Sequence, residues 1–208
     1  MYVPPRASRR LLILFDGQNV FGDEGSYSGG WHADATVAKL PGTVDRPMVV
    51  ALHHGHHHRN RELWTDLEAL LALILHQLLP AVRERWVVEG PIVLGGASLG
   101  GLAALSGHFR HPDVFGGALC MSPSFWYDQG AIFRELPRSP FPGSRIYIDM
   151  GLREGRAMLP MALRMVEALR ERGFADDQLM WRPDKRGIHH EKHWRWRLGK
   201  ALRFMFRR

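Results

Sequence analysis

Residues 91–109 read PIVLGGASLGGLAALSGHF and join an apolar run to a segment rich in small residues. The apolar run is typical of a buried strand, and the segment after it is typical of a helix packed close to that strand. Between them, residues 96–100 fit the pattern G-x-S-x-G around Ser98. Small neighbours in this pattern let the backbone fold into a strained strand-to-helix turn that exposes the serine hydroxyl. The stretch therefore predicts a nucleophilic Ser98, with a bystander serine in a glycine-rich turn as the alternative.

Elsewhere the chain alternates between short apolar runs and segments of helical periodicity. The predicted strands are residues 10–15, 48–52, 91–96, 115–121, 144–150 and 178–183. The predicted helices are residues 62–85, bent at Pro80, 99–109, 156–172, ended by Gly173, and 191–206. Strands that alternate with helices through short connections pair in parallel and carry helices on both faces of one sheet. We therefore predict an α/β fold with a mostly parallel central sheet.

Composition limits the class of protein. The chain has 208 residues, of which 45% are hydrophobic, so we expect one domain over residues 1–208. Its apolar runs are too short for a signal peptide or a bilayer span, so we expect a soluble cytoplasmic protein without membrane contact. The net charge is +7, but the arginines are scattered and no nucleic-acid-binding motif accompanies them, so we expect no nucleic-acid partner. The single cysteine, Cys120, excludes an internal disulfide, and nothing in the sequence indicates an oligomeric state.

A nucleophilic serine needs partners from elsewhere in the chain. Its hydroxyl requires a base, the base requires a carboxylate, and on this type of sheet they follow the serine in the order acid, then histidine. The turn also places the N–H of Leu99 at a helix start, where it can donate to an oxyanion. The candidates beyond later strands are Asp149 and Glu154 for the acid, and His189, His190 and His193 for the base.

Position within the predicted elements ranks these candidates without deciding between them. Asp149 falls inside a predicted strand, whereas Glu154 falls in the loop after it and is freer to reach a histidine. His193 falls in the last predicted helix, which makes it less suitable than the two loop histidines before it.

Six segments together carry a family resemblance. They are YVPP (2–5), LFDGQNVF (14–21), GASLGGL (96–102), HPDVFGGALCMSPSFW (111–126), DMGLREG (149–155) and IHHEKHWRWRL (188–198). In this order they resemble the "Putative esterase" branch of the α/β-hydrolases, which includes enterochelin-esterase-like proteins, esterase D and some feruloyl esterases. The resemblance implies an α/β-hydrolase fold and a serine carboxylic-ester hydrolase that acts on a small-molecule ester without a cofactor.

The resemblance also implies roles for individual residues. Ser98 matches the nucleophile, and the fourth residue of a G-x-x-[D/E] segment, here Glu154, matches the acid. The base opens an H-N-E-x-x-W segment, which favours His189, although His190 stands at the Asn position and leaves a one-residue ambiguity. The second oxyanion donor would be the N–H of Gln18. A Ser-His dyad without Glu154 is the alternative, because some members of the family manage with one.

Further implications concern the cleft and the sheet edge. We predict substrate contacts from Asp16, His54 and Trp126, with simple packing as the alternative for Trp126. Family members carry an extra strand pair before the VPP segment, and almost nothing precedes it here, which predicts an N-terminally trimmed sheet. No long insertion lies between residues 122 and 144, so we expect an open, shallow pocket.

A histidine-rich tract, LHHGHHHRN at residues 52–60, raises the question of a metal. Its members are His53, His54, His56, His57 and His58, and they follow a predicted strand on the same edge as Ser98. Zinc sites of H-x-x-x-H type need a helix to align two imidazoles, which Gly55 disfavours here. We therefore predict no metal, and a rim loop that is either exposed or in contact with substrate.

Two other functions stay open from the sequence. The family resemblance extends to mycolyltransferases, so acyl transfer is an alternative to hydrolysis. A catalytically silent module that binds a siderophore-like ligand is an alternative of a different class.

Overall fold

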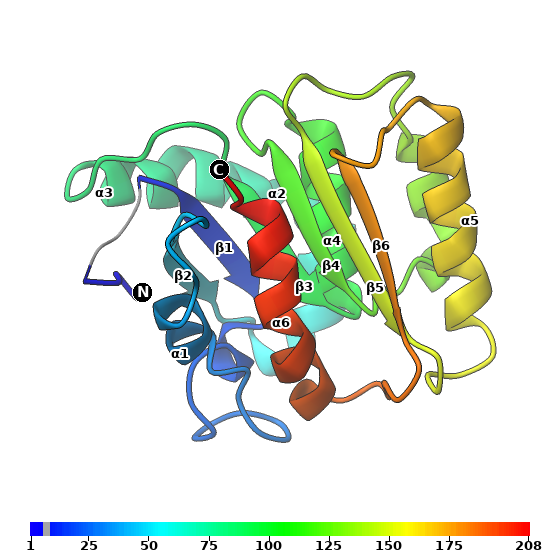
Figure 1. The fold of residues 1–208 in the computed structure, drawn as a ribbon, viewed down its shortest axis with the longest axis horizontal. Coiled ribbons are helices and arrows are strands. Elements are labelled where there is room, and N and C mark those ends of the chain that lie inside the picture. Colours follow the sequence, from blue (N-terminus) through cyan, green and yellow to red (C-terminus); the bar gives the residue numbers. More distant parts are fainter. Residues whose placement is uncertain (6–8) are drawn as a thin grey trace.

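The computed structural model describes residues 1–5 and 9–208, and its centre is one sheet of six parallel strands (Figure 1). The strands are β1 (Leu11–Phe15), β2 (Met48–Leu52), β3 (Val93–Ala97), β4 (Gly117–Met121), β5 (Arg145–Gly151) and β6 (Leu179–Asp184). Their spatial order is β2-β1-β3-β4-β5-β6. The chain therefore leaves β1 toward one side of the sheet and β3 toward the other. A crevice that can hold a ligand is expected where the two connections part.

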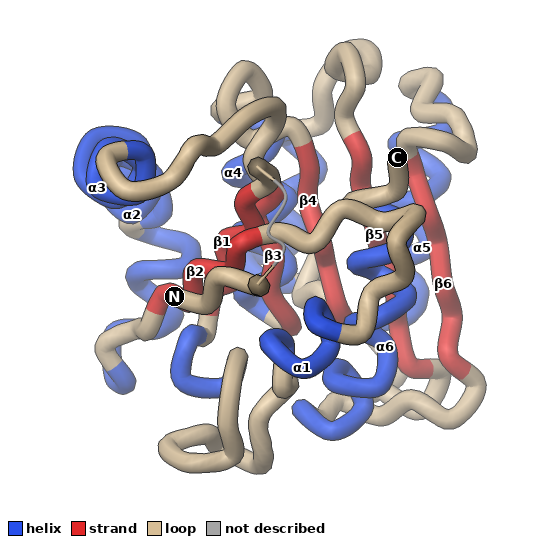
Figure 2. The backbone as a smooth tube through the Cα atoms, turned by 60° about the vertical axis from the view of Figure 1, so that its left-hand side comes forward, coloured by secondary structure: helices blue, strands red, loops and turns tan. Residues whose placement is uncertain are grey.

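Helices cover both faces of this sheet, as Figures 1 and 2 show. One face packs against α2 (Leu67–Leu73), α3 (Leu79–Arg83), α4 (Leu99–Arg110) and α5 (Met158–Glu171). The other packs against α1 (Ala33–Ala38) and α6 (Glu191–Met205). Along β1, Leu11 and Ile13 belong to the first core, and Leu12 belongs to the second. This double burial explains why the strands are continuous apolar runs and confirms the predicted α/β fold.

The predicted helix over residues 62–85 is helical but not continuous. It begins with a π-helical turn, η3 (Arg61–Thr65), is interrupted at Asp66 (φ −105°, ψ 22°), and widens again into a π-helical turn, η4 (Ile74–Leu78). The second turn directly precedes α3, whose first turn contains Pro80. Proline has no N–H to donate to the carbonyl four residues earlier, which favours the wider turn at this place. The prediction of one continuous helix over residues 62–85 was therefore wrong, because the backbone leaves helical values at Asp66; the bend at Pro80 stays a prediction.

Within the described residues, four helical segments were not predicted: the 3-10 turns η1 (Gly17–Asn19) and η2 (His56–His58), α1, and η5 (Tyr127–Glu135). η5 includes three consecutive left-handed residues, 128–130, which leave no helical period for the sequence to show. Beyond the β2 edge, Tyr2 forms one antiparallel bridge with Val49.

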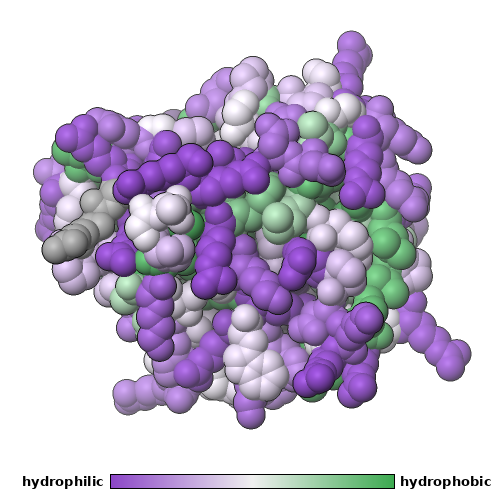
Figure 3. All heavy atoms as spheres, in the orientation of Figure 1, coloured by the Kyte–Doolittle hydropathy of each residue, from purple (hydrophilic) through white to green (hydrophobic). Residues whose placement is uncertain are grey.

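The surface over α1 and α6 is mostly hydrophilic (Figure 3), in keeping with the net charge of +7. Within residues 1–5 and 9–208, none of the helices combines the length and the apolar character that crossing a membrane requires.

Candidate active site

Ser98 occupies a strained turn between β3 and α4. Its φ of 56° and ψ of −120° are rarely adopted by residues other than glycine, and such a conformation costs about 1–3 kcal/mol. The turn is held by a hydrogen bond of 2.9 Å from the Ser98 N–H to the carbonyl of Met121 on β4. A Cβ atom on Gly96 would lie 2.5 Å from the carbonyl carbon of Gly100, so the glycine before the serine is required by close backbone contact. This is the geometry that the G-x-S-x-G pattern predicts.

Ser98, a carboxylate and a histidine follow three different strands, β3, β5 and β6, and they meet at one edge of the sheet. The Nε2 atom of His189, beyond β6, lies 3.0 Å from the Oγ atom of Ser98. The Nδ1 atom of the same ring lies 2.9 Å from Oε2 of Glu154, beyond β5. The neighbouring His190 instead caps α6, where its Nδ1 accepts from the N–H of Lys192 at 3.2 Å. The structure therefore joins Ser98, His189 and Glu154, and it directs His190 elsewhere.

Glu154 is held as a buried carboxylate. Its Oε1 atom accepts from the Ser122 hydroxyl at 2.7 Å and from the Gly151 N–H at 2.8 Å. The guanidinium of Arg197 lies 3.3 Å from the same oxygen. Burial raises the pKa of Glu154, but the hydrogen bonds from His189 and Ser122 and the charge of Arg197 outweigh it and hold the pKa below its ordinary value. The group facing His189 is therefore negatively charged at neutral pH.

The two predicted oxyanion donors lie on adjacent elements. Leu99 is the first residue of α4, and the first N–H groups of a helix have no partner within it. Gln18 belongs to η1, which directly follows β1, the neighbour of β3 in the sheet. A Cβ atom on Gly100 would lie 3.0 Å from the carboxylate of Asp16, which shows how closely the two turns approach.

A cavity of about 580 Å³ opens at this edge of the sheet. Its lining residues are Asp16, Gln18, Asn19, Gly25, Tyr27, His54, His57, Arg59, Ser98, His189, Glu191 and Trp194. Asp16 and His54, two of the predicted substrate contacts, are among them. Trp126 is not: its ring is 46% exposed and packs edge-on against Tyr127, with ring centroids 6.0 Å apart.

Comparison with known proteins now adds the family. A family model described as "Putative esterase" matches residues 1–205. The chain belongs to this esterase family. The membership confirms the resemblance that the six sequence segments carry.

The proteins to which this chain is similar include siderophore esterases. The chain is 29% identical over 164 residues to the iron(III) salmochelin esterase of Escherichia coli, covering 70% of this chain and 39% of that protein. It is 30% identical over 146 residues to the uncharacterized protein YbbA of Bacillus subtilis, covering 65% of this chain and 58% of that one. The enterobactin esterase of Shigella flexneri superposes with a TM-score of 0.76 and 25% identity, over 95% of this chain and 51% of that one. The chain thus spans about half the length of the relatives that it matches.

Two histidines of the tract, His54 and His57, line the cavity, and the side chain of His56 lies outside the described part of the structure. The ring of His54 contacts the Gln18 side chain and lies 3.5 Å from Asp16, and His57 lines the cavity. Residues 56–58 form a 3-10 turn, η2 (His56–His58), rather than an α-helix. In the described part of the chain, no three histidine, cysteine, aspartate or glutamate residues are grouped as a metal site requires.

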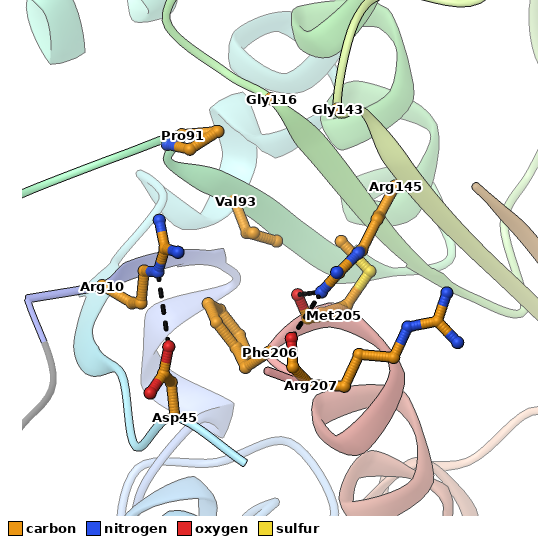
Figure 4. A pocket seen from close by; sticks show the side chains of 10 residues that line it. All are labelled: Arg10, Asp45, Pro91, Val93, Gly116, Gly143, Arg145, Met205, Phe206 and Arg207. Atoms are coloured by element: carbon orange, nitrogen blue, oxygen red, sulfur yellow. Dashed lines mark hydrogen bonds and ion pairs between the residues drawn. The ribbon is translucent and has the colours of Figure 1, made fainter. Parts of the chain in front are cut away.

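A second cavity, of about 130 Å³, lies at the opposite edge, among the amino ends of the strands (Figure 4). Its polar groups serve the fold. Arg10 pairs with Asp45 at 3.5 Å, and Arg145 donates to the carbonyls of Met205 and Arg207 at 3.1 and 3.0 Å, near the end of α6. The Met205 carbonyl is one of those that a helix C-terminus leaves without partners, and the Arg207 carbonyl lies just beyond the helix.

The sequence did not reveal the buried side chains that hold Glu154 from the side away from His189. Arg197, which is 5% exposed, reaches Asp149 at 3.3 Å as well as Glu154. The indole N–H of Trp194 donates to the Ser122 hydroxyl at 2.9 Å. Trp194 and Arg197 are three residues apart and so share one face of α6, which is the signal that could have placed this arginine inside.

Asp149, the other candidate acid, faces this network and not His189. Its carboxylate accepts from the Ser122 N–H and the Tyr147 hydroxyl, both at 3.1 Å. Complete burial raises the pKa of Asp149 to about 6 despite the nearby charge of Arg197. The two carboxylates near the end of β5 therefore have opposite pKa shifts.

The raised pKa of Asp149 predicts a stability effect. A carboxyl whose pKa is about 6 in the folded protein and about 3.9 in the unfolded chain stabilises the fold at low pH, and this contribution is lost as pH rises through about 6. Asn carries no charge, so the free energy of unfolding of Asp149→Asn relative to wild type should rise by about 1 kcal/mol between about pH 5 and about pH 8. Urea denaturation at both pH values measures it.

Asp176→Asn, at an exposed position, is the control for this comparison. A pH-dependent change no larger for Asp149→Asn than for Asp176→Asn would contradict the prediction.

Proposed function

We propose that this chain is a serine carboxylic-ester hydrolase with Ser98 as nucleophile, His189 as base and Glu154 as the orienting acid. The observation that carries the proposal is the continuous contact Ser98–His189–Glu154, at 3.0 and 2.9 Å, beside the cavity. Membership of the esterase family supports the reaction class. The activity is a proposal for this chain, because the chain spans only about half the length of the esterases named above.

The geometry suggests how each proton moves. As Ser98 Oγ attacks the ester carbonyl carbon, its proton passes to Nε2 of His189, and the carbonyl oxygen becomes an oxyanion. Glu154 holds the Nδ1–H tautomer and stabilises the imidazolium that forms. His189 then gives the proton to the leaving alcohol, and the acyl group stays on Ser98. Water, activated by the same ring, attacks the acyl-enzyme and releases the acid, which restores the serine.

The oxyanion is stabilised by donors that are already in place. The Leu99 N–H points from the positive end of α4, and the Gln18 N–H comes from the turn after β1. Donors fixed in advance act most strongly in a site that excludes water, because they need not reorient as the charge develops.

We infer a small-molecule ester as substrate. Two of the named relatives are esterases of iron(III) salmochelin and of enterobactin. In this chain the cavity presents the ring of Tyr27, which is 90% exposed, together with His57 and Arg59. A tyrosine in the cavity lining suits an ester whose acyl part is aromatic.

Removal of the nucleophile tests the proposal directly. Ser98→Ala should lower kcat/KM for p-nitrophenyl butyrate by at least about 10⁴-fold, because no other group can form the acyl-enzyme. A fluorophosphonate probe should label the wild type and not this variant. Ser106→Ala, in the same helix, is the control, since its hydroxyl donates to Glu135 at 2.5 Å.

Equal rates for Ser98→Ala and wild type would reject the mechanism. A wild-type chain that neither turns over esters nor reacts with the probe would support the silent binding module. Capture of the acyl group by an added alcohol in preference to water would support acyl transfer.

Adjacent histidines offer a matched pair for the base. His189→Ala should lower kcat/KM by at least about 10³-fold, because the serine loses its proton acceptor. His190→Ala should retain most of the activity and lose only the helix cap, at a cost of about 1 kcal/mol in the free energy of unfolding. Ester kinetics and thermal unfolding of both variants measure this, and a larger activity loss for His190→Ala would move the base to position 190.

Glu154→Gln separates a triad from a dyad. It keeps the shape of the side chain but removes the charge that orients and stabilises the imidazole. A working triad should lose about 10³- to 10⁴-fold in kcat. A kcat within about tenfold of wild type would establish the Ser-His dyad instead.

A further inference from the structure

A partly buried ion pair lies on the proposed oxyanion side of the cavity, away from Glu154. Asp16, which directly follows β1, is 4% exposed and has a left-handed backbone (φ 57°, ψ 48°). Both of its carboxylate oxygens accept from Arg59: Nε lies 2.6 Å from Oδ1, and Nη2 lies 2.8 Å from Oδ2. This two-point contact fixes the orientation of the carboxylate as well as its charge.

The position of the pair makes its charge matter for the proposed reaction. Asp16 is two residues before Gln18, and a Cβ atom on Gly100 would lie 3.0 Å from its Oδ2. Its carboxylate therefore borders both turns that supply the oxyanion N–H groups. An uncompensated negative charge there would oppose the negative charge that develops on the substrate oxygen.

We propose that Arg59 is a positioning residue for hydrolysis: it neutralises Asp16 beside the oxyanion hole and fixes the turn that carries the Gln18 N–H. The inference rests on the proposed function. Arg59 lies outside the six segments that carry the family resemblance.

The other charges around the pair support this role. Two groups from the segment after β2 approach Asp16. One is Arg59, and the other is the ring of His54, which lies 3.5 Å from the carboxylate. Tyr27, His57, His189 and Glu191 complete the titratable groups that share the cavity lining with the pair. Burial lowers the pKa of Arg59, but its hydrogen bonds to Asp16 and the charges of Asp16 and Glu191 outweigh it and raise the pKa. Arg59 thus balances two carboxylates.

Charge removal on each side of the pair tests the inference. Arg59→Met keeps the length of the side chain but strands the Asp16 carboxylate, so kcat for p-nitrophenyl butyrate should fall by about 10- to 100-fold, with KM changed by less than about threefold. The double variant Asp16→Asn/Arg59→Met removes both charges and should recover at least about tenfold of that loss. Arg61→Met is the matched control, because Arg61 pairs with Asp66 on the surface.

The pH profile distinguishes charge compensation from a merely structural role. A stranded buried carboxylate takes up a proton more readily, so the kcat ratio of Arg59→Met to wild type should rise as pH falls from about 8 to about 6. The same ratio for the double variant should stay constant. A loss in Arg59→Met that is pH-independent and not recovered by Asp16→Asn would overturn the inference.

Three further outcomes are decisive. If Arg59→Met does not fold, the double variant alone decides: a kcat within about tenfold of wild type supports charge compensation, and a loss as large as that of Ser98→Ala overturns it. If the wild type labels at Ser98 and hydrolyses esters while Arg59→Met keeps full kcat, this inference fails and the hydrolase proposal stands. An inactive, unlabelled wild type would overturn both.

Discussion

The close backbone contact between Gly96 and Gly100 is the constraint on which the rest of the site depends. It allows β3 to turn into α4 within one residue, and it leaves Ser98 with a positive φ that few side chains adopt. The strain is offset by the hydrogen bond from Ser98 to β4 and by the burial of α4 against the sheet. Without that packing, the backbone at Ser98 would relax to an ordinary turn, and the hydroxyl would move away from the ring of His189.

Much of the fold can be predicted from the sequence, and the reason is physical. Strands covered on both faces must be apolar throughout, so runs such as residues 10–15 stand out against their surroundings. Of the site, Ser98 carries a local backbone signature, and His189 and Glu154 lie in short loops after strands, where the family resemblance places them. Short helices such as α1 lack enough residues to display a period, so they stayed hidden.

The residues that sequence reasoning missed act through contacts between distant segments. Arg59 meets Asp16 across 43 positions, and Arg197 meets Glu154 across another 43. An arginine on a helix or loop is most often a solvated surface group, and nothing local marks the few that turn inward. Only the folded arrangement shows that these two cations lie beside buried carboxylates. Trp126 illustrates the reverse case, because a conspicuous aromatic residue in a family segment lies outside the cavity lining.

The sheet topology explains why the site divides into two electrostatic halves. The chain runs from β1 to one side of the sheet and from β3 to the other. A crevice is therefore expected between the carboxyl ends of these two strands, and the proposed oxyanion donors lie there. The acid and base come from β5 and β6, on the far side of β3. Each half contains buried carboxylate, and each has its own arginine.

The two arginines are used differently. Arg59 takes both oxygens of Asp16, which leaves the oxyanion side without net negative charge from that group. Arg197 shares itself between Asp149 and Glu154 and approaches only one oxygen of Glu154, leaving Oε2 for His189. The proposed mechanism moves negative charge toward one side and positive charge toward the other, and this asymmetry suits it: Asp16 is neutralised where the proposed oxyanion would form, and Glu154 stays anionic where the imidazolium would form.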